Sequence, residues 1–171
     1  VIAKEPWAKG IRTVAESDEK LIGLTFCDSS SDKVPPISSF AKFGVVAKIL
    51  RYTETQDKIQ FIAQGVRRFK IADWLRTSVP FVVRAEYPTE SVDMNDPQLR
   101  AYAMSLINGI KELMSKNPLY NEELKNYLNR FSPNDPAPLT DFAAAITSAE
   151  ASDLQEILET MPLLERMEKA L

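Results

Sequence analysis

The chain has 171 residues, of which 44% are hydrophobic, and its formal net charge at pH 7 is −3. This length and composition suffice for one globular core or two small ones, so we do not expect a disordered chain. No apolar run approaches the roughly 20 residues that cross a bilayer, and no signal peptide is evident. The sequence therefore predicts a soluble, cytoplasmic protein without contact to a membrane.

Residue types needed for common catalytic chemistry are missing. The sequence holds no histidine, and Cys27 is its only cysteine. Histidine-based acid–base catalysis, a Ser-His-Asp triad, an intrachain disulfide and an ordinary zinc site are therefore excluded. The five glycines are isolated, so no phosphate-binding loop is present. We expect no catalytic residue, no metal and no cofactor, and we expect Cys27 to be a buried, unreactive thiol.

The first third of the chain predicts a helix, a strand and a loop. A helix is expected over residues 5–16, because Pro6 suits a first helical turn and Trp7, Ile11 and Val14 share one face. Residues 21–27 form an apolar run typical of a strand. The polar, proline-containing stretch 28–39 then predicts an exposed loop.

A hairpin is predicted next. Apolar residues alternate over residues 44–50, a turn is expected at 53–57, and a second strand at 58–63. Gly65 marks a place where the chain reverses or bulges, after which residues 66–74 are predicted to return as another strand. A last strand, 81–87, is stopped by proline. Strands this closely spaced favour an antiparallel sheet or a small barrel.

The pattern becomes helical after residue 95, where Asp96 is expected to cap a helix that has Pro97 in its first turn. The aliphatic stripes of the following segments indicate the core of a helical bundle. We expect the last helix to continue past Leu171. The expected helices are 97–116, 121–131, a segment around 139–146, one capped by Ser152 and one that Pro162 opens.

Charge changes together with this pattern. Residues 1–92 hold 14 Lys and Arg against 11 Asp and Glu, whereas residues 93–171 hold 7 against 13. We therefore predict an α+β protein with two domains, a small antiparallel β lobe over 1–92 and an α-helical bundle over 93–171. Lys58, Arg68 and Lys70 could form a small basic patch, but a solvated sheet face explains them better, and we do not expect nucleic acid as a partner.

Five stretches, in this order, resemble the N-terminal region of the Lon family of ATP-dependent AAA+ proteases. Alternating strands and leucine-rich helices are common, so each stretch is weak evidence by itself, whereas five in the right order are strong. They are Gly44–Leu50, Ile62–Ile71, Ala101–Tyr120, Arg130–Pro136 and Leu154–Glu159.

The resemblance implies a PUA-like pseudo-barrel, of the type found in RNA-binding domains associated with pseudouridine synthases, followed by a helical bundle that leads into a long helix. It implies a cytosolic homohexamer in which this region captures unfolded or damaged protein substrates and supports assembly. The family's ATPase motifs and Ser-Lys proteolytic pair lie far downstream, so the chain itself is not expected to be an enzyme. The family's first strand should precede Val1, so the β lobe is expected to be incomplete.

Two other functions remain open. A stand-alone domain of the same fold could bind a ligand or a partner protein, although the helical segments 97–171 argue against it, and an RNA-binding module is a third possibility. For the Lon function, the candidate substrate contacts are Trp7, Phe40 and Phe43. Phe40 and Phe43 lie at the edge of the predicted loop. Trp7 shares a helical face with Ile11 and Val14, which favours a core position for it.

Overall fold

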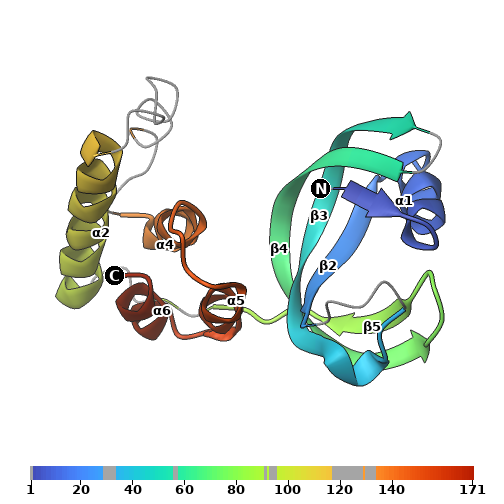
Figure 1. The fold of residues 1–171 in the computed structure, drawn as a ribbon. Helices are drawn as coiled ribbons and strands as arrows, with labels where there is room; N and C mark the ends of the chain where they lie inside the picture. Colours follow the sequence, from blue (N-terminus) through green and yellow to red (C-terminus); the bar gives the residue numbers. More distant parts are fainter. Residues whose placement is uncertain are drawn as a thin grey trace. The chain divides into compact units, whose positions relative to one another are not determined.

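The computed structural model describes residues 2–28, 34–55, 58–90, 92, 96–116, 129 and 134–171. The chain separates into two compact units, Val1–Pro88 and Thr89–Leu171. We call them the sheet unit and the helical unit (Figure 1). No described helix is long and apolar enough to cross a membrane.

The sheet unit is built on five antiparallel strands, which confirms the predicted antiparallel sheet. The strand order is β1-β4-β3-β2, and β5 also pairs with β4. One α-helix and one short 3₁₀ helix complete this unit (Figure 1). The elements are β1 (Ile2–Lys4), α1 (Trp7–Ala15), β2 (Leu21–Cys27), the 3₁₀ helix Ile37–Ser39, β3 (Phe40–Thr55), β4 (Lys58–Arg76) and β5 (Val82–Glu86).

Of the two alternatives expected at Gly65, the structure confirms the bulge, and the return as a separate strand was wrong. β3 and β4 stay paired from Thr55↔Lys58 to Phe43↔Lys70, with a register shift where Val46 pairs with Arg67 and Ala47 with Gly65. The extra residue, Val66, forms a β-bulge. Because β3 is long enough to supply a partner on both sides of the bulge, the ladder continues, and the predicted strands 58–63 and 66–74 are one strand.

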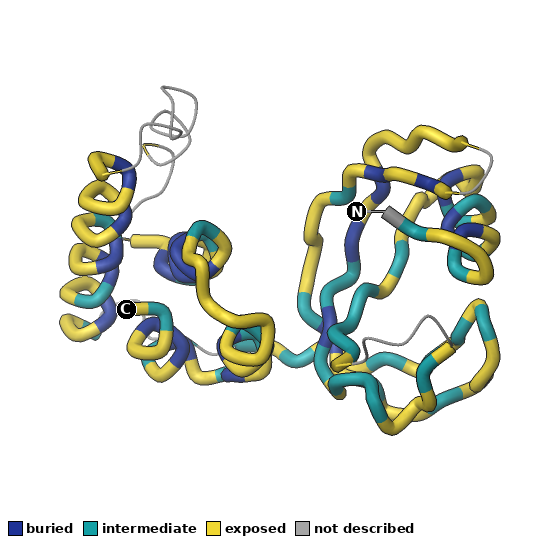
Figure 2. Tube along the Cα trace, viewed as in Figure 1, coloured by how far each residue is buried: buried dark blue, intermediate teal, exposed yellow. Residues whose placement is uncertain are grey.

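Helix α1 confirms the helix expected over residues 5–16. Pro6 lies at its N-cap position, and Arg12 joins it to β3 through a hydrogen bond from Nε to Glu54 Oε1 of 2.9 Å. One buried core holds this helix on the sheet (Figure 2). Its buried members are Ala8, Ile11 and Ala15 from α1 and Ile49, Ile59 and Phe61 from β3 and β4.

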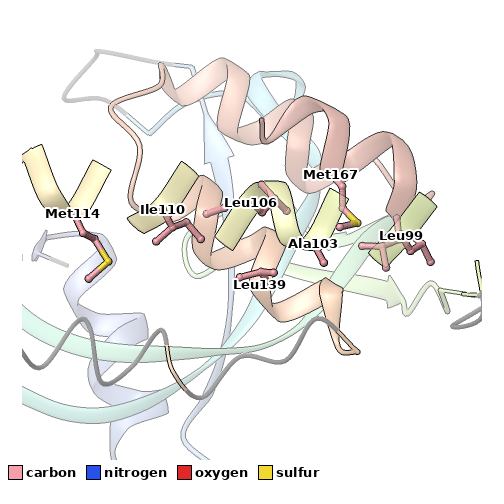
Figure 3. Close-up of a cluster of buried hydrophobic side chains, with 9 residues drawn as sticks. Leu99, Ala103, Leu106, Ile110, Met114, Leu139 and Met167 are labelled. Carbon is pink, nitrogen blue, oxygen red and sulfur yellow. The ribbon is translucent and has the colours of Figure 1, made fainter. Parts of the chain in front are cut away.

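The helical unit has a core of its own, formed along one face of α2 by side chains that α4 and α6 complete. Figure 3 shows Leu139 and Met167 beside this face. The described helices are α2 (Pro97–Lys116), α4 (Pro136–Ala145), α5 (Ala151–Glu159) and α6 (Leu163–Lys169). The buried core residues are Leu99, Ala103, Leu106, Ile110, Met114, Leu139, Ala143, Leu163 and Met167.

The helix starts were predicted with one error. Asp96 caps α2 as expected, because its Oδ1 accepts a 2.8 Å hydrogen bond from the backbone N–H of Gln98. Pro162 directly precedes α6 as expected. Ser152 is not a cap: α5 begins at Ala151, and the carbonyl of Glu150 accepts the hydrogen bonds of the first turn. The helix expected over 121–131 lies outside the described residues, apart from Asn129.

The last described helix is joined to α2. α6 spans Leu163–Lys169, and the backbone N–H of Ala170 donates to the carbonyls of Arg166 and Met167. Tyr102 on α2 donates a 2.8 Å hydrogen bond to Glu168 of α6, and this bond raises the pKa of the Tyr102 phenol. Helix α6 is therefore bound to α2 by core packing and by one polar contact.

Arg166 is the one arginine with a fully buried side chain among the described residues. Its two terminal nitrogens donate to the two carboxylate oxygens of Glu90 at 2.8 and 2.9 Å. Nη1 also lies 3.2 Å from the Thr160 carbonyl, and Nε lies 3.8 Å from Asp141 Oδ1. This paired geometry compensates part of the cost of burying the guanidinium. It also fixes the segment around Glu90 to the helical core.

Candidate functional site: an apolar cleft in the sheet unit

A cleft of about 640 Å³ opens in the sheet unit between α1, β2 and the segment from the end of β4 into β5. None of the described residues that line it is charged, and most are aliphatic or aromatic. Thr25 is one of its few polar members. The Thr25 hydroxyl lies 2.9 Å from the Ala41 carbonyl and so is engaged with the backbone of β3. The cleft therefore offers apolar contact rather than a polar pattern that could select one small molecule.

Four aromatic side chains form a connected cluster in this cleft, which we call the aromatic quartet: Trp7, Phe40, Trp74 and Phe81. The Phe40 and Phe81 ring centroids lie 5.2 Å apart, and Trp74 lies 5.5 Å from each of them. The Trp7 ring lies 5.5 Å from Phe81 and 6.5 Å from Phe40. All four side chains are partly exposed, so their rings are available to a ligand.

The ends of four elements place these rings together. Trp7 is the first residue of α1, Phe40 is the first residue of β3, Trp74 lies near the end of β4, and Phe81 directly precedes β5. The β4–β5 ladder pairs Trp74 with Val83 and thereby brings Phe81 back beside Trp74. Close packing of α1 against the turn before β5 holds this arrangement, since a Cβ on Gly10 would lie 3.0 Å from Pro80 Cβ.

The three predicted contact residues do not all lie in the cleft. Trp7 and Phe40 are brought together in the quartet, and Trp7 is partly exposed rather than fully in the core. Phe43 is partly buried outside the cleft lining, with the Lys70 ammonium 5.9 Å from its ring. Trp74 and Phe81 were not identified from the sequence. The sequence feature that could have identified them is that these two large aromatic residues lie on either side of one short turn between strands.

Cys27 lines the cleft, but its environment does not activate it. Burial, and secondarily the charge of Asp28, raise the pKa of the Cys27 thiol. The thiol therefore stays protonated at neutral pH and is a poor nucleophile. Within the described part of the chain, no group of three or more His, Cys, Asp or Glu side chains could hold a metal ion. The cleft offers shape and apolar surface to a ligand.

A partly exposed apolar cleft lined by aromatic rings is typical of a binding site. The family model of the ATP-dependent protease La (LON) substrate-binding domain matches residues 2–171. The chain belongs to this family.

Curated relatives and solved structures agree with this assignment. The chain is 40% identical over 171 residues to Lon protease 2 of Hydrogenovibrio crunogenus, and 35% identical over 161 residues to Lon protease 1 of Syntrophotalea carbinolica. These alignments cover 100% and 94% of the chain but only 20% of each relative. The chain thus spans about a fifth of the length of these relatives.

The fold is that of solved Lon N-terminal domains. The N-terminal domain of the Mycobacterium avium complex Lon protease superposes with a TM-score of 0.72 at 18% identity, covering 99% of this chain and 86% of that one. A Lon N-terminal domain protein from Xanthomonas campestris superposes with a TM-score of 0.61 at 14% identity, with the same coverage of both chains.

Proposed function

We propose that this chain is the non-catalytic, substrate-capturing part of a longer cytoplasmic Lon protease, an ATP-dependent Ser-Lys endopeptidase that works as a homohexamer. Its partners are unfolded or damaged polypeptides, and it supports assembly of the hexamer. The observation that carries the proposal is the apolar cleft, with its four partly exposed aromatic residues and no charged side chain among the described lining residues. Trp7 and Phe40 of the predicted contacts belong to this site, together with Trp74 and Phe81, and Phe43 is a separate candidate outside it.

Two features of the fold support a more specific description of the architecture of each unit. β4 pairs with β3 on one side and with β1 and β5 on the other, and residues of β2 and β5 line one cleft. We therefore propose that the sheet unit is a PUA-like pseudo-barrel that is open at this cleft. The shared core of α2, α4 and α6 supports a helical bundle for the second unit.

The chemistry of the cleft suits a protease that accepts many unfolded chains. Apolar burial is not directional, so it tolerates many side-chain sequences. A partly exposed ring buries only part of its area on binding and contributes about 1–2 kcal/mol. The affinity of one copy of the domain for a polypeptide should then be micromolar or weaker. Six copies that bind the same polypeptide would reach a higher overall affinity through avidity.

Removing two rings of the quartet should weaken the binding of unfolded polypeptide. We expect Phe40→Ser with Phe81→Ser to weaken the affinity for carboxymethylated, permanently unfolded lactalbumin by about tenfold or more, because two apolar contacts are lost. The measurement is fluorescence anisotropy with labelled lactalbumin, after circular dichroism has shown that the variant is folded. Phe43→Ser is measured separately, and a similar loss would add Phe43 to the site.

Ile62→Ser is the matched control, because Ile62 is 60% exposed and apolar but does not line the cleft. The affinity of this variant for unfolded lactalbumin should stay within about twofold of that of the unsubstituted chain, since a surface substitution away from the site has little effect. Unchanged affinity in the double variant would remove the cleft from the mechanism. Equal binding of native, folded lactalbumin would contradict the capture of unfolded chains.

The chain by itself should be a monomer or a weak dimer. In the proposed protease the hexamer is held together mainly by ATPase and protease rings, so this domain is expected to support assembly without driving it. Multi-angle light scattering at micromolar concentration should give a mass near the 19.2 kDa of one chain. A stable hexamer under these conditions would refute this expectation.

A further inference from the structure

The two units meet in the chain at a single peptide bond, because the sheet unit ends at Pro88 and the helical unit begins at Thr89. Neither residue belongs to a helix or a strand, and Thr89 is exposed. Neither one makes a hydrogen bond, an ion pair or a ring contact with any described residue. Interactions of the residues on either side of this pair therefore determine how far the connection can move.

On the sheet side, the chain is held in place as far as Tyr87. The β4–β5 ladder extends to the pair Lys70↔Glu86. Tyr87 is the next residue, and the guanidinium carbon of Arg67 on β4 lies 4.0 Å from the centroid of its ring. A guanidinium over an aromatic face is an attractive cation–π contact. Both residues belong to the sheet unit, so this contact holds the Tyr87 ring against β4.

On the helical side, the chain is held in place directly after Thr89. The buried guanidinium of Arg166 donates one hydrogen bond to each carboxylate oxygen of Glu90, at 2.8 and 2.9 Å. Such a bidentate pair fixes the geometry of both side chains. Val92 also packs against the core of the helical unit. Glu90 and Val92 are therefore joined to the helical core.

Pro88 and Thr89 are the two residues between these fixed points. The proline ring sets φ of Pro88 at about −65° and keeps the preceding Tyr87 in an extended conformation. Rotation is therefore left mainly about ψ of Pro88 and about φ and ψ of Thr89. Three peptide steps join Tyr87 to Glu90 and span at most about 11 Å. The connection can rotate, but it cannot lengthen.

We propose that Pro88 and Thr89 form a hinge about which the two units reorient as rigid bodies, and that Arg67 and Arg166 confine the motion to these two residues. Hinges are typically a few residues outside regular elements that absorb changes in φ and ψ. In the proposed function, the hinge would let the sheet unit turn toward a polypeptide while the short connection limits how far it can travel. The hinge does not depend on that function and can be tested without a substrate.

The first test measures backbone amide residual dipolar couplings of the whole chain, weakly aligned by anionic filamentous phage. A rigid molecule has one alignment tensor, whereas two mobile units have two. The units carry opposite net charges, so the phage aligns them differently if they can move. We expect two tensors whose magnitudes differ by about twofold or more, because hinge motions in the microsecond-to-millisecond range are averaged in the couplings. The Tyr87 amide should fit the tensor of the sheet unit, and the Glu90 amide that of the helical unit.

The second test stiffens the hinge with Thr89→Pro. A second proline ring fixes φ of residue 89 and restricts ψ of Pro88, so the magnitudes of the two tensors should become nearly equal. Thr89→Ala is the matched control, because it keeps the rotation and should leave both tensors as they are in the unsubstituted chain. The couplings within each unit also show whether the variant has kept its fold.

The third test removes the contact on the sheet side with Arg67→Ala. The Tyr87 amide coupling should fall by about a third or more, because the ring loses its cation–π contact and the hinge lengthens by one residue. The Ala85 amide is the internal control, since the β4–β5 ladder pairs Ala85 with Ile71 and its coupling should not change.

Each part of the proposal has a result that would overturn it. A single tensor for both units in the unsubstituted chain would show that they form one rigid body. A Glu90 coupling that does not fit the helical tensor would mean that Arg166 does not bound the hinge, and an unchanged Tyr87 coupling in Arg67→Ala would exclude Arg67. Unequal tensors in Thr89→Pro would place the rotation elsewhere. No substrate is present in these measurements, so none of these results bears on the proposed function.

Discussion

Replacing Arg166 with methionine is expected to lower the free energy of unfolding of the helical unit by about 3–5 kcal/mol. The substitution keeps an apolar stem of similar length but removes the guanidinium, whose nitrogens lie 2.8 and 2.9 Å from the carboxylate oxygens of Glu90. Because the Glu90 side chain is only 20% exposed, its charge would be left poorly solvated. Urea denaturation followed by circular dichroism in the helical region measures the loss.

The double variant Arg166→Met with Glu90→Gln is the matched control. It removes both charges, so it should recover part of the loss, and together with Glu90→Gln alone it completes the double-mutant cycle that gives the coupling of the pair. Arg166→Lys should also be destabilising, because an ammonium cannot form the two parallel hydrogen bonds that the guanidinium makes. A loss below about 1 kcal/mol in Arg166→Met would show that the pair behaves like an exposed surface ion pair.

Replacing Gly44 with alanine is expected to destabilise the sheet unit by about 3 kcal/mol, the upper part of the usual range for inserting a methyl group into a packed core. A Cβ on Gly44 would collide with the backbone carbonyl of Leu24 and would lie 2.8 Å from the Phe69 ring. A backbone atom cannot move aside without disturbing the β2–β3 ladder. Since Trp7 and Trp74 both lie in the sheet unit, urea denaturation followed by tryptophan fluorescence reports on this unit.

Gly65→Ala provides the comparison on the next strand. A Cβ at Gly65 would lie 3.3 Å from Cγ1 of Val45, which is a side-chain atom that can shift. We therefore expect a change of less than about 1 kcal/mol. Equal destabilisation by the two substitutions would mean that loss of glycine as such, and not the close approach of β2 to β3, determines the effect at residue 44.

Local patterns in the sequence were sufficient for most of the elements. An apolar run predicted β2, alternation predicted the β3–β4 hairpin, and a short run stopped by proline predicted β5. The Asp96-Pro97 pair predicted the start of α2. Gly65 was ambiguous because a glycine suits both a turn and a bulge, and only the length of the partner β3 decides between them. β1 was not predicted, since a strand of three residues gains its stability from pairing with β4, a contact far away in sequence.

The candidate site was predicted only in part, for a physical reason. Trp7 and Phe40 could be proposed because each is a large aromatic residue for which the sequence pattern does not decide between the core and the surface. Trp74 and Phe81 joined them only once β4 and β5 were paired, and Phe43 was separated from them by the alternation of side chains along β3. Which aromatic residues share a cleft depends on strand register, and short-range patterns do not define the register between distant strands.

Strand β4 also implies an order in which the sheet forms. Its contacts with β3 begin at Thr55↔Lys58, two residues close together in the sequence. Its contact with β1 instead joins Lys4 to Lys58, which are separated by more than half of the sheet unit's sequence. Chain entropy favours the local hairpin as the nucleus and leaves β1 to dock late. Substitutions in β1 should then accelerate unfolding and leave the refolding rate almost unchanged, whereas substitutions at the paired ends of β3 and β4 should slow refolding.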